Sequence, residues 1–220
     1  MKYYEAYEER YKAIHKKGHS WSSDKPTPIV LKTIGNLYLS KEDSILEIGC
    51  GEGRDAKAIL ELGFNLFACD ISHEAISYCK AIMPSYSHRF FRLDCLHGKH
   101  EKQYKFIYSI AVIHMLVLDE DRKKFYDFIY NHLENGGYAL ICSMGDGIQV
   151  FNTDPNDAFK MVKRHHDSGT ITVTATSCRV VSTKTFEKEI KSANLTIVKK
   201  GITHSLPDFD NLMYALVKKE

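Results

Sequence analysis

The chain has 220 residues, a hydrophobic content of 44% and a formal net charge of +2. This length suits one domain with a sizeable core, and the near-neutral charge gives no reason to expect a nucleic-acid partner. No apolar run approaches the roughly 20 residues of a membrane helix, and the first residues lack the apolar region of a signal peptide. The six cysteines form no C-x-x-C pair, which indicates reduced thiols and no metal site. We therefore expect a cytoplasmic protein with no membrane partner.

An aromatic stripe marks the beginning of the chain. Tyr4, Tyr7, Tyr11 and Ile14 recur at helical spacing, which predicts a helix packed on the core through that stripe. A helix in this place could also be a lid that closes over a ligand and its reaction partner. A second helix is predicted over 28–38, because proline favours the first helical turn.

The middle of the chain alternates short apolar runs with helical patterns. This alternation is typical of a parallel sheet whose strands are joined by crossover helices. The predicted strands are 44–48, 65–70, 89–93, 106–110 and 138–142. The predicted helices between them are 54–63, 73–83 and 119–133. A ligand is expected at the carboxyl ends of these strands, as in open α/β sheets generally.

The last third of the chain begins with an insertion over 148–166. A turn is predicted at 152–155, followed by a helix through Phe159 and Val162. Alternation of threonine with apolar residues predicts a strand over 170–181. The remaining predicted elements are a helix over 183–193, capped by Ser182 or Thr183, and two strands over 195–203 and 212–218.

A glycine turn follows the first predicted strand of the core. Residues 49–53 read Gly-Cys-Gly-Glu-Gly, and alternate glycines let the backbone turn tightly and leave no Cβ in the way of a ligand. Amides at the start of the next helix add a polar cradle. Asp70 ends the next apolar run, where its carboxylate can bind ribose hydroxyls. A nucleoside-bearing cofactor is therefore expected here.

The spacing of the glycines distinguishes between nucleoside cofactors. NAD-binding turns read G-x-G-x-x-G, whereas this chain has G-x-G-x-G with Glu47 two residues before the first glycine. A carboxylate beside the turn would repel a pyrophosphate and attract an amino-acid ammonium. S-adenosylmethionine carries an ammonium and a sulfonium and no phosphate, so it fits this turn better than NAD does. A dehydrogenase-like nucleotide fold is the alternative.

Five segments in order resemble the motifs of the class I S-adenosylmethionine-dependent methyltransferases. Residues 46–53, Leu-Glu-Ile-Gly-Cys-Gly-Glu-Gly, resemble motif I. The other matching segments lie at 67–72, 92–95, 106–116 and 133–141. The resemblance implies an α/β, Rossmann-like fold: a seven-stranded, mostly parallel sheet with helices on both faces, an antiparallel last strand and an N-terminal helical lid.

The same resemblance implies a binding site for S-adenosylmethionine, with S-adenosylhomocysteine as the product. It places Asp70 on the ribose hydroxyls, Asp94 near the adenine amino group, and the Cys95 amide near the adenine ring. Trp21, the only tryptophan, is a candidate to cover the cofactor or substrate, with simple packing as the alternative. The full set of expected donor-binding residues is Trp21, Glu47, Gly49, Cys50, Gly51, Gly53, Arg54, Asp70, Ile71, Asp94, Cys95, Ser109 and Ile110.

Two residues are candidates for catalysis. Methyl transfer from a sulfonium is an in-line displacement that depends mainly on positioning, and a base is needed only when the acceptor arrives protonated. His114 follows the fourth strand and is the candidate base, with a role in holding the loop or the cofactor as the alternative. Asp146 lies between two glycines just after the fifth strand. It could bind a cationic substrate or accept a proton, or it could simply belong to a turn.

We therefore predict one methyltransferase domain over 1–220 that acts on a small molecule at a nitrogen, oxygen or sulfur atom, as a monomer or homodimer. Its parts would be an N-terminal helical cap (1–40), a cofactor-binding core (41–142), an insertion that contacts the substrate (143–182), and a C-terminal helix with strands (183–220). Residues 53–56 are similar to those of the thiopurine and tellurite-resistance methyltransferases. The alternatives are an RNA or protein methyltransferase, and a catalytically silent scaffold that binds the donor. Aminopropyl transfer on the same fold lacks the expected acidic pair.

Overall fold

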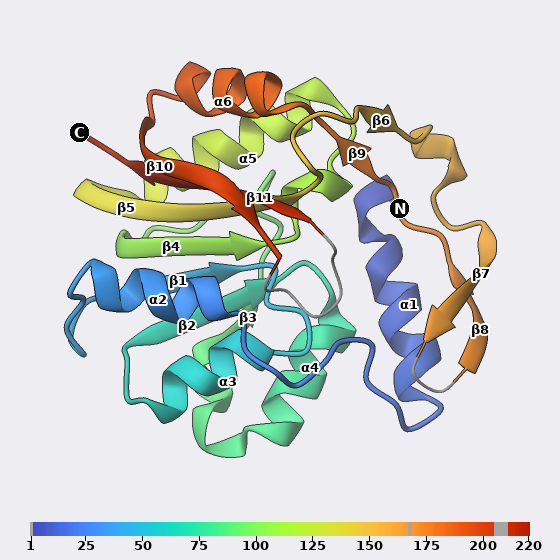
Figure 1. Ribbon diagram of the computed structural model, residues 1–220. Helices are drawn as coiled ribbons and strands as arrows, with labels where there is room; N and C mark the ends of the chain where they lie inside the picture. The colour runs from blue at the N-terminus through green and yellow to red at the C-terminus, as the bar shows by residue number, and fades with distance from the viewer. Residues whose placement is uncertain (1, 167–168, 205–210) are drawn as a thin grey trace.

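The computed structural model describes residues 2–166, 169–204 and 211–220 (Figure 1). Its centre is a seven-stranded sheet with the strand order β10-β11-β5-β4-β1-β2-β3. The strands are β1 (Ile45–Ile48), β2 (Leu66–Asp70), β3 (Phe90–Arg92), β4 (Tyr104–Ile110), β5 (Leu133–Met144), β10 (Thr196–Thr203) and β11 (Leu212–Lys218). This order and the mixed directions confirm the predicted fold class.

The burial of the strands agrees with their directions. Strands β1 to β5 pair in parallel. Every residue of β1 is buried, as expected for a parallel strand with helices on both faces of the sheet. Only β11 breaks the pattern, because it runs antiparallel to both β5 and β10. The ligand edge predicted from the sequence is therefore the shared carboxyl end of β1, β2, β3, β4 and β5.

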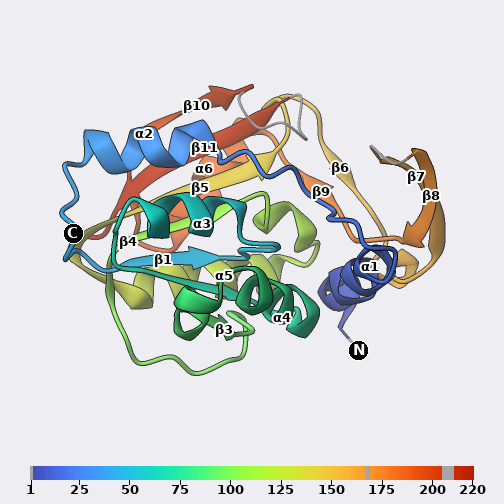
Figure 2. The same ribbon diagram turned by 90° about the horizontal axis from the view of Figure 1, so that it is seen from below.

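Five helices cover the two faces of the sheet (Figures 1 and 2). One face carries α2 (Pro28–Asn36), α3 (Arg54–Glu61) and α4 (His73–Ile82), and the other carries α5 (Asp119–His132) and α6 (Thr183–Ser192). The start signals read from the sequence act as expected. Ser72 accepts a hydrogen bond from Ala75 N, and Ser182 accepts one from Thr185 N.

A smaller layer lies beside the sheet, on the side of its ligand edge. It contains η1 (Tyr3–Glu5), α1 (Ala6–His15) and an antiparallel hairpin of β7 (Met161–His166) and β8 (Gly169–Thr174). Helix α1 lies between α4 and this hairpin (Figures 1 and 2). The remaining short elements are η2 (Pro84–Arg89), η3 (Ile113–Met115), η4 (Pro155–Asp157), β6 (Phe151–Asn152) and β9 (Arg179–Val180).

The insertion differs from its prediction. The helix expected through Phe159 and Val162 is absent: Val162 belongs to β7, and Phe159 sits in a turn with a φ of 72°. The strand expected over 170–181 is split into β8 and β9. Both errors have one cause, because the amide of Phe159 bonds the Ala175 carbonyl and the Ala175 amide bonds Lys160, so the chain folds back into a hairpin. Cross-strand pairing of this kind overrides local helix propensity.

Two further structural features bear on the function classes considered above. In the described ranges, no helix combines the length and apolar character needed to cross a bilayer. The same ranges bring together no group of three or more histidine, cysteine, aspartate or glutamate side chains that could hold a metal ion.

Candidate active site

The glycine turn after β1 forms the centre of the ligand edge. Gly49, Gly51 and Gly53 all have left-handed backbone, with φ values of 74°, 53° and 80°. Gly49 is also closely packed, since a Cβ there would lie 2.3 Å from Val112 Cγ2 in the loop after β4. Only glycine satisfies both requirements. The structure therefore explains the glycines by backbone conformation and by close packing of protein side chains, and the close approach of a ligand stays a prediction.

Asp70 holds the turn in place from the end of β2. Its Oδ2 accepts a hydrogen bond of 2.9 Å from Gly51 N, and its Oδ1 accepts one of 2.8 Å from Ser72 N. Burial raises the pKa of this carboxyl, and the two amides oppose that effect. The neighbouring Ile71, partly buried, offers its carbonyl to Arg92 Nε.

Glu47 is a buried carboxylate with an unused oxygen. Its side chain lies in β1, it is 4% exposed, and its Oε2 has no hydrogen-bond partner among the described residues. Burial raises the pKa of this carboxyl well above its ordinary value, and the neighbouring Tyr108 hydroxyl opposes that effect. An unpaired buried acceptor is costly, and either a ligand or a closer approach of the Tyr108 hydroxyl would supply the missing donor.

Asp94, beyond the end of β3, is tied to the N-terminus of the chain. Its Oδ2 accepts a 2.6 Å hydrogen bond from Lys2 Nζ, and its Oδ1 accepts one of 2.9 Å from Leu96 N. Partial burial works against ionisation, but the bonds from Lys2 and Leu96 prevail and lower the pKa of Asp94. Burial also raises the pKa of the adjacent Cys95 thiol to about 12, so this thiol stays protonated.

The other expected donor-site residues line the same edge and are partly structural. Ser109 Oγ donates a 3.1 Å bond to the Ile48 carbonyl and so joins the ends of β4 and β1. Ile110 and Cys50 are buried beside it, and Cys50 packs among the core residues on the α3 and α4 side of the sheet. Arg54 is the first residue of α3, directly after the turn.

His114 lies in η3, the short helix that follows β4. Its ring is buried, with 5% of the residue exposed. Burial, together with the positive charge of Arg122, lowers the pKa of His114 to about 4. The imidazole is therefore neutral near pH 7 and able to accept a proton. Because Val112 in the same loop touches the glycine turn, His114 is close in the chain to the predicted donor site.

Asp146 caps the loop that follows β5. Its Oδ1 accepts hydrogen bonds of 2.8 Å from both Ile148 N and Gln149 N, and these amides lower its pKa. The flanking glycines admit close packing, since a Cβ at Gly147 would lie 2.2 Å from Thr183 Oγ1. These contacts account for the turn, and the role of Asp146 in catalysis stays a prediction.

Comparisons with known proteins point to one family. A family model described as a methyltransferase domain matches residues 45–137, which include the glycine turn, Asp70, Asp94 and His114. Residues 45–137 are thus identified as a methyltransferase domain, in agreement with the resemblance of the chain to the class I S-adenosylmethionine-dependent methyltransferases. No curated protein sequence matches it.

Solved structures share the methyltransferase fold over most of the chain. An S-adenosylmethionine-dependent methyltransferase from Clostridium acetobutylicum has a TM-score of 0.68 at 18% identity, covering 95% of this chain and 96% of that one. The glycopeptide N-methyltransferase MtfA in complex with S-adenosylmethionine has a TM-score of 0.64 at 13% identity, with coverage of 89% and 95%. A protein described with the conversion of a disulfide bond into a thioacetal group during echinomycin biosynthesis has a TM-score of 0.65 at 17% identity, with coverage of 91% and 85%.

An N-terminal segment covers the ligand edge, which the sequence predicted only in outline. We call this segment, residues 2–27, the lid; it contains α1 and the residues after it. Glu8 Oε2 accepts hydrogen bonds from Ser72 Oγ (2.6 Å) and Glu74 N (3.1 Å) at the start of α4. Tyr11 lies over the glycine turn, since its hydroxyl would be 2.8 Å from a Cβ placed on Gly51. The lid thus occupies the ligand edge itself.

Glu52 connects the glycine turn to the lid, a contact that the sequence did not single out. This buried side chain accepts bonds from His15 Nε2 (2.9 Å), Trp21 N (2.7 Å), and both N and Oγ of Ser22 (2.8 Å each). The signal available in the sequence was its position inside the glycine turn. Trp21, half-buried against the hairpin, is therefore attached to the glycine turn through its backbone, and its place beside the cofactor stays a prediction, with simple packing as the alternative.

Arg10 anchors the lid on its other side. Its Nη2 donates a 2.7 Å hydrogen bond to the Thr174 carbonyl at the end of β8, and its guanidinium stacks over the rings of Tyr7 and Trp21. Stacking and hydrogen bonding together stabilise this buried cation. The lid and the hairpin therefore form one packed unit.

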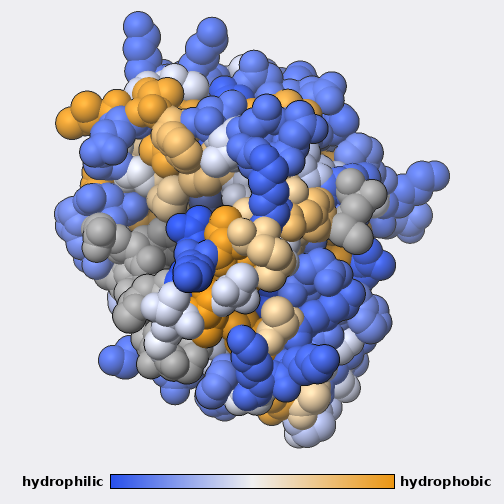
Figure 3. All heavy atoms as spheres, turned by 90° about the vertical axis from the view of Figure 1, so that its right-hand side faces the viewer, coloured by the Kyte–Doolittle hydropathy of each residue, from blue (hydrophilic) through white to orange (hydrophobic). Residues whose placement is uncertain are grey.

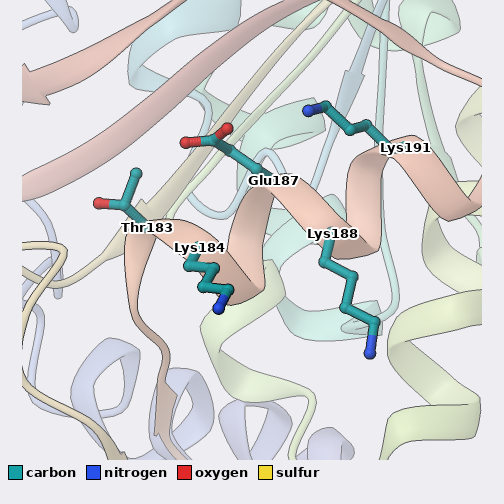
Figure 4. Close-up of a pocket in the computed structure, with 5 residues that line it drawn as sticks. All are labelled: Thr183, Lys184, Glu187, Lys188 and Lys191. Atoms are coloured by element: carbon teal, nitrogen blue, oxygen red, sulfur yellow. The ribbon is translucent and has the colours of Figure 1, made fainter.

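Two surface hollows lie around α6. One is lined by Thr183, Lys184, Glu187, Lys188 and Lys191, whose long side chains extend outward from the helix (Figure 4). The other continues from α6 towards β10. Neither contains a residue of the glycine turn, so neither is the donor site.

The Glu52 contacts predict how firmly the lid is held. We expect Glu52→Gln to loosen the lid by about 1 kcal/mol, because the ion pair with His15 is lost while one acceptor oxygen remains. Trp21, as the only tryptophan, reports the change: its fluorescence should move to longer wavelength and become more accessible to acrylamide. Glu61→Gln, which alters an exposed pair with Lys57, is the matched control. Equal acrylamide quenching in both variants would contradict the role of Glu52 in holding the lid.

Proposed function

We propose that this methyltransferase transfers the methyl group of S-adenosylmethionine to a nitrogen, oxygen or sulfur atom of a small molecule. One observation supports the donor most directly. Glu47 has a buried oxygen without a hydrogen-bond partner among the described residues, and it precedes the glycine turn by two positions in the chain. An ammonium group would supply the missing donor there, and a pyrophosphate would be repelled.

The ligand edge offers one group for each part of the donor. Glu47 would bind the amino-acid ammonium, Asp70 the ribose hydroxyls and Asp94 the adenine amino group. Asp70 is already fixed by two backbone amides, so it is held in place before a ligand arrives. Asp94 is held by Lys2 of the lid, so binding of adenine requires this ion pair to rearrange.

The protein itself forms no covalent bond in this reaction. S-adenosylmethionine supplies an electrophilic methyl group: the acceptor forms the new bond to its carbon while the carbon–sulfur bond breaks, and the sulfonium becomes a neutral thioether. The closed lid excludes water and holds the reactants in line. Neutral His114 is the proposed acceptor of a proton released by the substrate, and Asp146 is a second candidate.

Several observations support a small-molecule acceptor. The chain is compact and nearly neutral, and its lid and hairpin close over the ligand edge. On the side of the molecule that faces the viewer in Figure 3, apolar side chains lie interspersed among hydrophilic ones. The structural neighbours include a glycopeptide N-methyltransferase and a protein of echinomycin biosynthesis. We further propose a cytoplasmic monomer or homodimer.

An exposed apolar segment is the observation that favours the scaffold alternative. Ile148, Val150 and Phe151, after β5, are 82%, 72% and 54% exposed, as a surface for a partner protein would be. A scaffold of this kind would bind the donor and transfer no methyl group.

Calorimetric titration with S-adenosylmethionine, S-adenosylhomocysteine and NAD tests the donor. Binding of the first two and not of NAD is the expected result, and binding of NAD alone would overturn it. A screen with methyl-labelled donor against small-molecule mixtures, total RNA and protein then tests the acceptor. Label in the small-molecule fraction supports the proposal, whereas label in RNA or protein supports the corresponding alternative.

A further inference from the structure

Arg122, in the first half of α5, is a fully buried cation with a dedicated partner. It is 1% exposed, and its Nε and Nη2 donate to the two carboxylate oxygens of Glu189 on α6, at 2.8 Å and 2.7 Å. Tyr126 OH donates to the same carboxylate at 3.1 Å. Such a forked pair fixes both the position and the plane of the guanidinium.

The remaining edge of Arg122 is directed at the loop that carries His114. Its Nη1 donates to the Ile113 carbonyl at 2.7 Å and to the Leu116 carbonyl at 3.2 Å. These two carbonyls lie on either side of His114 in the chain. The buried guanidinium therefore holds the backbone on both flanks of the histidine and ties it to two helices of the core.

Other contacts hold this loop further along the chain. Val117 N donates to Tyr3 OH at 3.2 Å, and the Val117 carbonyl accepts a 2.9 Å bond from Arg179 Nη1. Both contacts lie at the far end of the loop, next to α5. Arg179 is thus a natural comparison for Arg122, since it is also an arginine bonded to a carbonyl of the same loop.

We propose that Arg122 is the positioning residue for His114: fixed by Glu189, it holds the carbonyls on both sides of the histidine and so sets the place of the ring in the loop after β4. This inference rests on the proposed function, because it gives His114 a part in the reaction. Arg122 itself touches neither donor nor acceptor.

The charge of Arg122 also acts on the ring. A nearby cation disfavours imidazolium, so the guanidinium keeps the resting ring neutral and at the same time makes it a weaker proton acceptor. Burial lowers the pKa of His114 to about 4, and Arg122 adds to the shift. A residue with a purely structural role would support the loop without contributing this electrostatic effect.

An NMR titration of the His114 ring in the donor-free protein tests the inference without an acceptor. We expect Arg122→Met to raise the midpoint by about one pH unit, because the like charge is removed. Arg122→Lys should keep the wild-type midpoint while losing the forked geometry. Arg179→Met is the control and should leave the midpoint unchanged.

Kinetics with the acceptor found by the screen complete the test. We expect Arg122→Lys to lower kcat about tenfold while KM and the affinity for S-adenosylhomocysteine stay close to the wild-type values. An unchanged midpoint in folded Arg122→Met, or an equal loss of donor affinity and kcat in Arg122→Lys, would overturn the proposal. If Arg122→Met does not fold, Arg122→Lys alone decides it through kcat and donor affinity.

The variant His114→Gln separates the base role of His114 from the positioning role of Arg122. Full activity of His114→Gln would remove the proposed base role, and the ring titration would still decide whether Arg122 controls His114. Failure of the donor to bind in the wild-type protein would instead remove the proposed function itself.

Discussion

Gly49→Ala is expected to abolish measurable donor binding and to destabilise the fold. The left-handed backbone at this residue would cost alanine about 1–2 kcal/mol, and the contact of its Cβ with Val112 would add about 1–3 kcal/mol of overpacking. The φ of 74° and the 2.3 Å approach to Val112 Cγ2 are the structural basis. Denaturant unfolding and calorimetry with S-adenosylhomocysteine measure the two effects.

Alanine substitutions at two other glycines separate the effect of backbone strain from the effect of a Cβ that meets its neighbours. Gly63 has a φ of 83° with open space around its missing Cβ, so Gly63→Ala carries the backbone strain alone. Gly35 lies inside α2 in open space and without a positive φ, so Gly35→Ala should stabilise the protein by about 0.4–1 kcal/mol. If Gly49→Ala costs no more than Gly63→Ala, the loop after β4 does not press on the glycine turn.

Asp70→Ala is expected to weaken binding of S-adenosylhomocysteine by about 1–3 kcal/mol, the usual contribution of a charged hydrogen-bond partner. The structure adds a second reason for the loss. The same carboxylate accepts the amides of Gly51 and Ser72, so its removal also releases the turn that the donor rests on. Calorimetry measures the affinity.

Asp70→Asn and an exposed aspartate complete this experiment. The asparagine keeps one acceptor oxygen and should lose less affinity than the alanine. Asp127→Ala changes an exposed ion pair with Lys123 on α5 and should leave donor binding unchanged. Wild-type affinity in folded Asp70→Ala would remove Asp70 from the donor site.

The core of the site could be predicted because its signals are local. Glycine at 49, 51 and 53, an apolar strand before them and Asp70 at the end of the next strand are features of short segments. The alternation of strands and helices then places all of these at one edge of a parallel sheet. His114 follows from the same rule, since it comes directly after a strand of that sheet.

The lid contacts could not be predicted because they join distant segments. Nothing local indicates that Arg10 bonds the carbonyl of Thr174, or that His15 lies between Glu52 and Glu74, at 2.9 Å and 2.8 Å. The hairpin was missed for the same reason, since its strand pairing competes with a weak helical pattern. Arg122 is a similar case. A charged residue in an amphipathic helix is expected to be exposed, and its burial becomes clear only when its partner Glu189 on α6 is known.

The place of β11 has a consequence for synthesis on the ribosome. This strand is the last element of the described chain, yet it lies between β5 and β10. While it is still in the ribosomal tunnel, the open edge of β5 has no neighbour on that side, and β10 has no route into the sheet. An open strand edge invites wrong pairing with other chains. The nascent protein therefore completes its sheet only after β11 has emerged, and truncation before residue 212 should leave the edge of β5 open and favour aggregation.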